Sequence, residues 1–339
     1  MNTCNDGYTF NSAFANDLIA TVNSVIRSVH KRDIQLLRRW YYIRCILYTF
    51  AFVYTAWLWM FTPNALTAIA FGTAKACMAL NIAHDGSHGA IGDVSKVASR
   101  VFDLIGASSL LWFQQHIMRH HPFTNDYACD KDVSSSEPVL YFSIKERPKR
   151  NLLVKFQYIL WPIWFQMYAI IVMAESLSMK KYSDTTVNRA TIINAKAFLP
   201  LRLATKLMWI FVPFFNSHYS TLQYCLHFYI MSATVSLILT TLFMVSHNFV
   251  GSVREKGGMV CWYTQQAESS CTYGGRWAGF LTGGLNYQIE HHLFPKLPSY
   301  VYPIIHPYIR ALCTKHCVRY TYFPTFGDNL RSTIKYLQQ

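Results

Sequence analysis

Long apolar runs with very few charged residues are the feature that most limits how this chain can fold. The first extends from Ile43 to Phe61 and the second from Ala65 to Ile82, with the short turn Thr62-Pro63-Asn64 between them. A helix needs about 20 apolar residues to cross a bilayer, so each run is close to the required length. Because the turn is short, the two runs predict an antiparallel helical hairpin whose ends return to the same side of a membrane.

The composition agrees with a protein that is largely surrounded by lipid. Of the 339 residues, 52% are hydrophobic and 14% are charged, whereas ordinary soluble domains carry about 25% charged residues. The formal net charge of +14 would also suit a nucleic-acid-binding protein. The basic residues, however, are grouped between the apolar runs, chiefly in 27–44 and 145–150, as in loops that face anionic lipid in the cytosol. We therefore expect an integral membrane protein that binds membrane lipid and no nucleic acid.

Seven of the 13 histidines form three clusters. They are His84 and His88 in HDGSH, His116, His120 and His121 in HIMRHH, and His291 and His292 in QIEHH. On an α-helix a spacing of four places two side chains on one face, whereas the side chain next to His120, that of His121, points about 100° away. Imidazole binds zinc, copper, iron and nickel, and seven imidazoles exceed the four ligands of one zinc ion. The clusters therefore predict a site for two metal ions.

Several residues near the clusters are candidates for supporting roles. Asp85 and Glu290 lie inside clusters, where a carboxylate often accepts a ring N–H from a ligand histidine. Gln288 stands three residues before His291, and the single residue His247 ends the last apolar run. The remaining histidines have no clustered partner and are interpreted as structural: His30, His218, His227, His306 and His316.

Three further apolar runs decide the topology: Leu152 to Ala174, Ala197 to Phe215 and Leu222 to Ser246. If residues near 120 and near 290 share a site, the number of crossings between them must be even. A crossing by Leu152 to Ala174 would place the basic residues between Lys180 and Lys206 on the far side, against the positive-inside tendency. We therefore expect that run to be interfacial or re-entrant, and the last two runs to form a second hairpin that turns near 216–220. The alternative, in which Leu152 to Ala174 crosses and Ala197 to Phe215 does not, stays open.

The expected fold is all-α and integral to the membrane. It has four transmembrane helices in two hairpins, interfacial helices, and a cytosolic helical cap that carries the di-metal site. Residues 1–40 would be a cytosolic N-terminal segment with an amphipathic stretch lying on the membrane surface, 41–325 the membrane domain, and 326–339 a C-terminal tail. Both termini are expected in the cytosol.

The three clusters resemble the histidine boxes of the membrane fatty acid desaturase superfamily, H-x(3,4)-H, H-x(2,3)-H-H and [HQ]-x-x-H-H. Their order and spacing match, and the resemblance covers roughly residues 40 to 325. Gln288, in place of the first histidine of the third box, is typical of front-end desaturases, which insert a double bond between an existing one and the carboxyl end. The sequences WFQQHIMRHHPFTN and GGLNYQIEHHLFPKLP around the second and third boxes agree with this subgroup.

The resemblance implies a di-iron centre that activates dioxygen and removes two hydrogens from adjacent methylenes of an acyl chain, carried on coenzyme A or a phospholipid. It implies that the seven clustered histidines bind the irons. His247 would be an eighth ligand, since the family places one at the end of the last membrane helix, and a structural role is the alternative. Gln288 would hydrogen-bond a metal-bound water. Trp112, Phe113 and the run Ala278 to Leu285 are candidates for the acyl tunnel, with ordinary packing as the alternative.

Many front-end desaturases carry a fused cytochrome b5 domain with an HPGG haem motif, and these 339 residues contain none. We therefore expect electrons from a separate donor, cytochrome b5 with its reductase, in the endoplasmic reticulum membrane. A related histidine-box enzyme, such as a fatty-acyl hydroxylase, acetylenase, ketolase or sphingolipid desaturase, is the first alternative. A non-enzymatic metal carrier or lipid-binding receptor is the second, and the scarcity of ionisable residues inside the predicted spans argues against a carrier.

Overall fold

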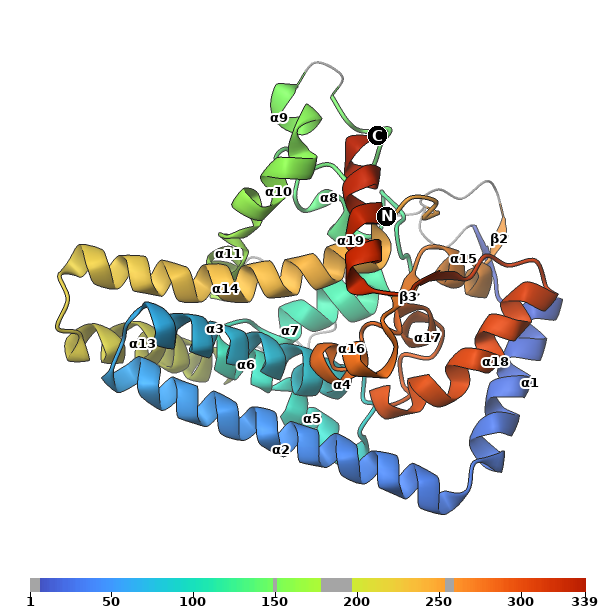
Figure 1. The fold of residues 1–339 in the computed structure, drawn as a ribbon, viewed down its shortest axis with the longest axis horizontal. Coiled ribbons are helices and arrows are strands. Elements are labelled where there is room, and N and C mark those ends of the chain that lie inside the picture. Colours follow the sequence, from blue (N-terminus) through green and yellow to red (C-terminus); the bar gives the residue numbers. More distant parts are fainter. Residues whose placement is uncertain (1–6, 149–150, 178–196, 254–258) are drawn as a thin grey trace. The chain divides into compact units, whose positions relative to one another are not determined.

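The computed structural model describes residues 7–148, 151–177, 197–253 and 259–339. These residues are mostly helical, as the sequence predicts, and they include four short strands (Figure 1). Several basic residues used to predict the topology, Lys149, Arg150 and those from Lys180 to Lys196, lie outside the described residues.

The chain divides into two compact units, each assembled from separate stretches of sequence. Unit 1 consists of Met1–Ile43, Gln115–Trp161 and Leu242–Gln339, and unit 2 consists of Arg44–Gln114 and Pro162–Thr241. The domain boundaries expected at residues 40 and 325 stay predictions.

Unit 2 contains the first predicted hairpin. Its two helices are α2 (Lys31–Phe61), which begins in unit 1, and α3 (Ala65–Met78). The Asn64 side chain fixes the turn between them by accepting the backbone N–H groups of Leu66 and Thr67 at 2.9 and 3.0 Å. Asparagine is favoured at this position because its side chain satisfies amides that have no partner inside the helix.

A series of short helices leads from α3 to the second histidine box. They are η1 (Ala79–Ala83), α4 (His84–Ser87), η2 (Gly92–Val94), α5 (Ser95–Ser99), α6 (Val101–Ile105), α7 (Ser109–Trp112) and η3 (Phe113–His120), which enters unit 1. Both η1 and η3 are π-helices, a rare form that is often found at functional sites. The first directly precedes His84, and the second carries the HIMRHH box as far as His120.

The later helices complete unit 2. They are the second half of α10 (Gln157–Phe165), α11 (Tyr168–Glu175), α13 (Leu199–Asn216) and most of α14 (Thr221–His247). Aromatic side chains join α13 to the first hairpin. The Trp59 indole donates to the Trp209 carbonyl oxygen at 3.2 Å, and the Phe71 and Trp209 ring centroids are 4.9 Å apart. Such contacts combine burial of a large apolar area with a satisfied indole N–H.

Unit 1 contains the remaining elements. They are β1 (Tyr8–Thr9), α1 (Ala13–Ser28), α8 (Lys131–Ser134), α9 (Leu152–Lys155), β2 (Val260–Cys261), α15 (Trp262–Glu268), β3 (Cys271–Tyr273), α16 (Gly275–Thr282), α17 (Gln288–Leu293), η5 (Ser299–Val301), α18 (Tyr302–Lys315), β4 (Thr321–Phe323) and α19 (Phe326–Gln338). The strands form two parallel pairs, β1 with β2 and β3 with β4. Each pair joins segments that lie far apart in the sequence, although each strand has only two or three residues.

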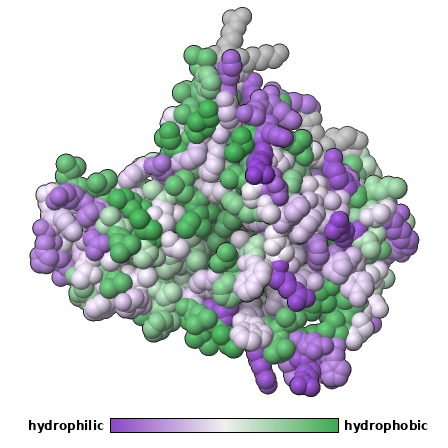
Figure 2. Space-filling view, in the orientation of Figure 1, coloured by the Kyte–Doolittle hydropathy of each residue, from purple (hydrophilic) through white to green (hydrophobic). Residues whose placement is uncertain are grey.

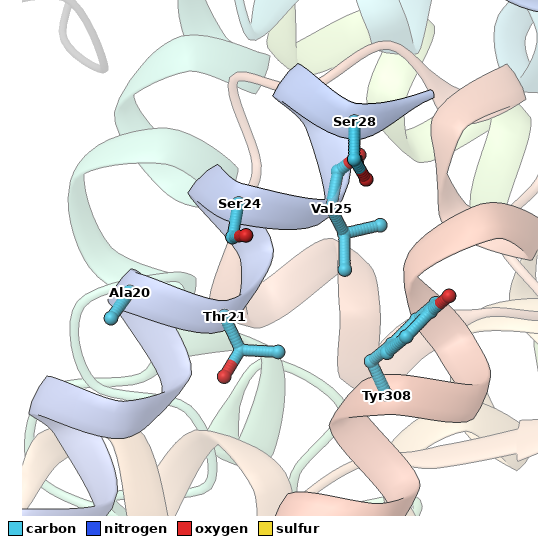
Figure 3. Close-up of a pocket in the computed structure, with 6 residues that line it drawn as sticks. All are labelled: Ala20, Thr21, Ser24, Val25, Ser28 and Tyr308. Carbon is cyan, nitrogen blue, oxygen red and sulfur yellow. Dashed lines mark hydrogen bonds between the residues drawn. The ribbon is translucent and has the colours of Figure 1, made fainter. Parts of the chain in front are cut away.

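The amphipathic stretch near the N-terminus is helix α1, and its apolar face is buried inside unit 1. Phe14, Leu18 and Val22 pack in one core with residues of α17 and α18. This face therefore has protein partners, and the expectation that the stretch lies on the membrane surface stays a prediction. A shallow groove of about 470 Å³ remains between α1 and α18, where the Tyr308 ring faces small and hydroxyl-bearing side chains such as Thr21 and Ser24 (Figure 3).

Three helices in the described part of the chain are long and apolar enough to cross a membrane: α2, the continuous stretch Ala65–Ser87, and α14. Hydrophobic side chains such as Phe50 and Trp57 are exposed on α2, and Figure 2 shows hydrophobic residues spread over the visible surface. Helices α10 and α11 are bent by 49° at a short break, so this pair is a broken fourth span or a re-entrant loop. The protein is therefore a helical membrane protein with three to four candidate spans.

Helix α13, which the sequence predicts as a crossing, is not among these candidates in the described residues. Arg202 and Lys206 lower its hydropathy. The bent pair α10–α11 falls within the run Leu152 to Ala174, and a bent pair suits both the interfacial interpretation and the alternative. The choice between the two topologies thus stays a prediction.

Candidate metal centre

Three histidines from separate elements converge in unit 1. His120 ends η3, His247 ends α14 and His292 lies in α17. Their side chains are buried, and one ring nitrogen of each lies within 4.8 Å of those of the other two. Nitrogens at this spacing can bind a common ion, since metal–nitrogen bonds in proteins are about 2.0–2.1 Å for zinc. The structure therefore groups His247 with histidines of the second and third boxes.

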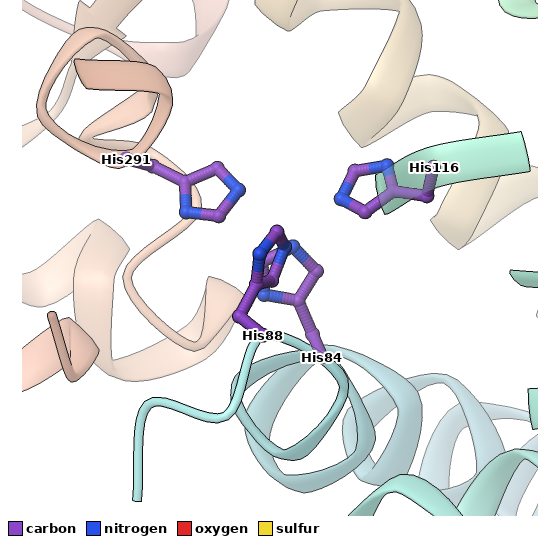
Figure 4. Close-up of side chains that lie close together, drawn as sticks. All are labelled: His84, His88, His116 and His291. Atoms are coloured by element: carbon purple, nitrogen blue, oxygen red, sulfur yellow. The ribbon is translucent and has the colours of Figure 1, made fainter. Parts of the chain in front are cut away.

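A second group of ring nitrogens forms in the same unit. The Nε2 atom of His121 lies 3.2 Å from that of His116 and 3.1 Å from that of His291. Figure 4 includes His116 and His291, whose rings are stacked with their centroids 6.2 Å apart. One nitrogen cannot donate a proton to both neighbours, so a cation is the natural partner for the lone pairs that gather here.

The π-helix explains why His121 takes part. The backbone N–H of His121 bonds the carbonyl oxygen of His116 at 3.0 Å, five residues back. Residues five apart therefore lie on adjacent turns, and His116 faces both His120 and His121. From α-helical geometry His121 is expected to point about 100° away from His120, and the two rings do take part in different nitrogen groups. The π-helical hydrogen bond adds the close approach of His121 to His116, which α-helical geometry does not provide.

The first box lies in unit 2. His84 begins α4 and His88 directly follows its last residue, and Figure 4 shows their rings side by side, with centroids 4.7 Å apart. Between them, Gly86 allows a close approach of α5, since a Cβ atom there would lie only 2.6 Å from the Cβ of Ala98. The Asp85 carboxylate lies 3.7 Å from Nδ1 of His84, which is too far for a hydrogen bond.

Hydrogen bonds at Nδ1 fix the ring orientation of four histidines in unit 1. Nδ1 of His120 lies 2.9 Å from Asp130 Oδ2, and Nδ1 of His292 lies 2.9 Å from Gln266 Oε1. Nδ1 of His291 lies 3.0 Å from the Tyr302 hydroxyl oxygen. Nδ1 of His247 lies 3.1 Å from the Ser269 carbonyl oxygen. Carboxylate and carbonyl oxygens can only accept, so the proton is on Nδ1 where they are the partners. The Nε2 lone pair is then available to a metal, as in most metal sites built from histidine.

These supporting residues were missed by the sequence analysis. Asp130 lies nine residues beyond the second box, and Gln266, Ser269 and Tyr302 belong to no box. Nothing in the spacing of the motifs indicates them, because only the tertiary contacts bring them to the rings.

Charge and burial act differently on two of the ligand candidates. Burial favours neutral His120, but attraction by Asp130 and the hydrogen bond to it prevail and raise its pKa to about 9. For His292, burial and the neighbouring histidines lower the pKa well below its usual value. His292 is therefore neutral at physiological pH, as a metal ligand must be, while Asp130 favours positive charge at His120, whether a proton or a metal ion carries it.

Gln288 reaches into the first group. Its side-chain nitrogen lies 3.0 Å from Nε2 of His247 and 3.2 Å from Nε2 of His292. The amide N–H groups can donate to both lone pairs, which agrees with rings protonated at Nδ1. Its Oε1 atom has no hydrogen-bond partner among the residues that the structure describes. The amide therefore lies at the Nε2 atoms that are candidates for metal binding.

Glu290 has several hydrogen-bond partners in unit 1. Its buried carboxylate accepts hydrogen bonds from Thr272 at 2.9 Å, from Tyr320, and from Nδ1 of His306 at 3.1 Å. His306 lies outside the boxes, so these partners do not include a box histidine, and a role of Glu290 in orienting a ligand stays a prediction. Glu290 anchors α17 to α18 and to the strand pair β3–β4.

The tunnel candidates are in packed surroundings. The Trp112 indole donates to Ser87 Oγ at 3.1 Å and stacks on Phe102 with centroids 4.7 Å apart. In α16, a Cβ atom added at Gly279 would lie 3.2 Å from Asn286 Oδ1. Both observations fit the ordinary packing that was the alternative for these residues.

Comparisons with known proteins agree with the motifs. The model of the family described as "Fatty acid desaturase" matches residues 62–324. The acyl-lipid (7-3)-desaturase of Diacronema lutheri is 31% identical over 291 residues, which cover 80% of this chain and 62% of that protein. Probable Delta(5) fatty acid desaturase C of Dictyostelium discoideum is 28% identical over a match that covers 82% of this chain and 64% of that protein. The sn-1 linoleoyl-lipid 6-desaturase of Synechocystis sp. is 25% identical over a match that covers 84% of each protein. The chain spans less than two thirds of the length of the first two relatives.

Proposed function

The chain belongs to the fatty acid desaturase family, and from this premise we propose that it is an oxygen-dependent acyl-lipid desaturase of the front-end type. It introduces a cis double bond into an unsaturated acyl chain, on the carboxyl side of an existing double bond. The observation that carries the proposal is the convergence of His120, His247 and His292 in unit 1, each supplied by a different element. Gln288 in the third box and the names of the relatives support the subgroup and the acyl-lipid substrate.

The donor set in unit 1 fits metal binding. Six buried imidazoles form two groups of nitrogens. With the proton on Nδ1 of His247, its Nε2 atom carries the lone pair that a metal would bind. His120, His247 and His292 would hold one ion. His116, His121 and His291 would contribute to a second, and the box pattern makes His84 and His88 further ligands.

Iron bound there would supply the dioxygen chemistry needed to break unactivated C–H bonds, which no side-chain acid or base can do. The chain's own residues have a positioning task. Asp130, Gln266, Tyr302 and Ser269 hold the rings in fixed orientations. Burial of the histidines excludes water, which strengthens the electrostatic interactions inside the site.

We further propose that α13 crosses the membrane despite its low hydropathy. Its basic side chains are turned inward: Arg202 and Asp103 are fully buried, with Arg202 Nη1 3.7 Å from Asp103 Oδ1, and Lys206 is buried too. Its exposed side chains include Leu203, Leu207 and Phe211. A charged side chain inside a membrane faces protein partners and leaves the apolar face to lipid. This arrangement supports a crossing by α13 and hence four spans in two hairpins. With these spans we propose that both termini lie in the cytosol and that the membrane is that of the endoplasmic reticulum.

Glycosylation tags test this topology. A tag in the turn at 216–220 is expected to be modified, and a tag at position 185, which lies outside the described residues, is expected to stay unmodified. Modification at 185 would show that the run Leu152 to Ala174 crosses instead.

For electrons we propose cytochrome b5 and its reductase. Each double bond consumes two electrons from outside the substrate if dioxygen is reduced to water. Reconstitution in liposomes with NADH and reductase, with and without cytochrome b5, tests this. Turnover that is equally fast without any added carrier would refute it.

Product analysis tests the central proposal. The chain is produced in a eukaryotic host that is fed acids of eighteen to twenty-two carbons with double bonds at known positions, and the new double bond is located by mass spectrometry. His292→Ala serves as the inactive control because His292 belongs to the first nitrogen group. A new double bond on the carboxyl side of an existing one is expected. A hydroxylated product, or a double bond on the methyl side alone, would contradict the proposal.

A further inference from the structure

Asn125 lies four residues after the second box and is almost fully buried, with 2% of its surface exposed. Its φ angle of 64° lies in the left-handed region. Asparagine tolerates this region better than other residues with a side chain, apart from aspartate. The conformation turns the backbone N–H and the side-chain amide of Asn125 toward two different parts of unit 1.

The backbone N–H of Asn125 bonds the residue that orients His120. It donates to Asp130 Oδ2 at 2.9 Å, and the same oxygen accepts Nδ1–H of His120 at 2.9 Å. The backbone conformation of Asn125 therefore helps to fix the carboxylate on which the ring of His120 depends.

The side-chain amide of Asn125 bonds the residues that orient His247. Its Nδ2 atom lies 2.9 Å from Ser252 Oγ and 3.2 Å from the carbonyl oxygens of Val253 and Ser269. It also lies 3.3 Å from the carbonyl oxygen of His247 itself. The Ser269 carbonyl oxygen is the acceptor for Nδ1–H of His247 at 3.1 Å. One amide group with two N–H bonds thus serves a set of acceptors around this ligand candidate.

We propose that Asn125 is a positioning residue of the metal centre. Its hydrogen bonds fix the positions of two acceptors, Asp130 and the Ser269 carbonyl oxygen. These acceptors in turn orient the rings of His120 and His247. These two rings come from different elements, η3 and α14, and they must meet at one ion. The inference rests on the proposed function only in taking these histidines as metal ligands.

The residue type follows from the contacts. Glycine would keep the left-handed backbone and the bond to Asp130 but would lose the amide. Aspartate has almost the same shape, but it would turn a carboxylate oxygen toward the carbonyl oxygens of Val253, Ser269 and His247. Oxygen facing oxygen in a buried place removes the donor that these acceptors share, which is costly. Asparagine combines both requirements, a tolerated left-handed backbone and a donor.

Cobalt(II) titration of the purified, metal-free full chain tests the proposal, because the absorption of bound cobalt reports ligand geometry without any need for turnover. The variants are Asn125→Gly and Asn125→Asp, with Asn16→Asp on the exposed side of α1 as the matched charge control. Loss of a residue that orients a metal ligand typically weakens binding about 10- to 100-fold. We expect Asn125→Gly to weaken one of two cobalt ions by that factor and to change its spectrum, with the second ion unchanged.

The comparison separates positioning from a purely structural role. If Asn125→Gly lowers the melting temperature of the metal-free protein but binds both ions with wild-type affinity and spectrum, the proposal is overturned. Asn125→Asp should bind still more weakly, and wild-type binding by this variant would also overturn it. A wild-type chain that binds cobalt but produces no desaturated lipid would contradict the proposed function alone, and the titration would still decide the role of Asn125.

Discussion

A single methyl group added at Gly86 should disturb the first histidine box more than it disturbs the fold. In α4, Gly86 lies between His84 and His88, and a Cβ atom there would lie 2.6 Å from both the Cβ of Ala98 and the backbone nitrogen of Ser99. Ordinary contacts begin at 3.4 Å, so α4 and α5 must move apart by about 0.8 Å. Backbone atoms cannot give way as a flexible side chain would.

Two opposing effects on stability are expected in Gly86→Ala. Alanine in a helix is more stable than glycine by about 0.5–1 kcal/mol, whereas overpacking costs about 1–3 kcal/mol. The net loss of stability is therefore about 0–2.5 kcal/mol, less than the total stability of a typical folded protein. A displacement near 1 Å at an active site, however, can lower the rate by about 100-fold. The expected signature is a large loss of turnover and metal content in a protein that still accumulates in membranes.

The assay compares Gly86→Ala with Gly92→Ala. Gly92 has a φ of +66°, and a Cβ atom there would meet nothing within 4 Å. Alanine at 92 thus adds backbone strain of about 1–2 kcal/mol without pushing on a neighbour. Desaturation per mole of protein, bound iron and the melting temperature in detergent are measured for both variants. If Gly86→Ala keeps turnover within twofold of wild type, the reasoning is refuted.

Three further predictions concern the metal centre. Purified active protein should contain two irons per chain, and metal analysis that finds one zinc and no iron would contradict the di-iron proposal. His247→Ala should abolish desaturation while the protein still accumulates in membranes, and normal turnover by this variant would return His247 to a structural role. His306→Ala should keep substantial activity because Thr272 and Tyr320 still bond the Glu290 carboxylate. Asp130→Asn removes the charge beside His120 and should weaken metal binding about 10- to 100-fold, as measured by cobalt titration, and unchanged affinity would show that the carboxylate is not needed.

The membrane character and the histidine clusters that are candidates for metal binding could be predicted from the sequence because both depend on local patterns. Apolar runs of nearly 20 residues need no tertiary information, and the turn at 62–64 was correctly placed because its asparagine caps the next helix within three residues. The clusters HDGSH, HIMRHH and QIEHH identify imidazoles by composition and spacing alone. The grouping of His247 with His120 and His292 agrees with the place of this residue at the end of the last apolar run.

Only the tertiary structure could decide how these residues are held. The close approach of His121 to His116 depends on the π-helical hydrogen bonds of η3, which the sequence pattern does not reveal. The amphipathic pattern of α1 fits a membrane surface and a protein core equally well, and only the structure shows that its apolar face packs against α18.

The same holds for the partners of the histidines. Asp130, Gln266 and Ser269 reach the rings through contacts between segments up to 26 residues apart, and Glu290 bonds His306 rather than a ligand. A sequence shows which side chains can bind a metal, because that is a property of each residue type. It does not show which hydrogen-bond partner each ring has, because that depends on how distant segments are positioned in the folded chain.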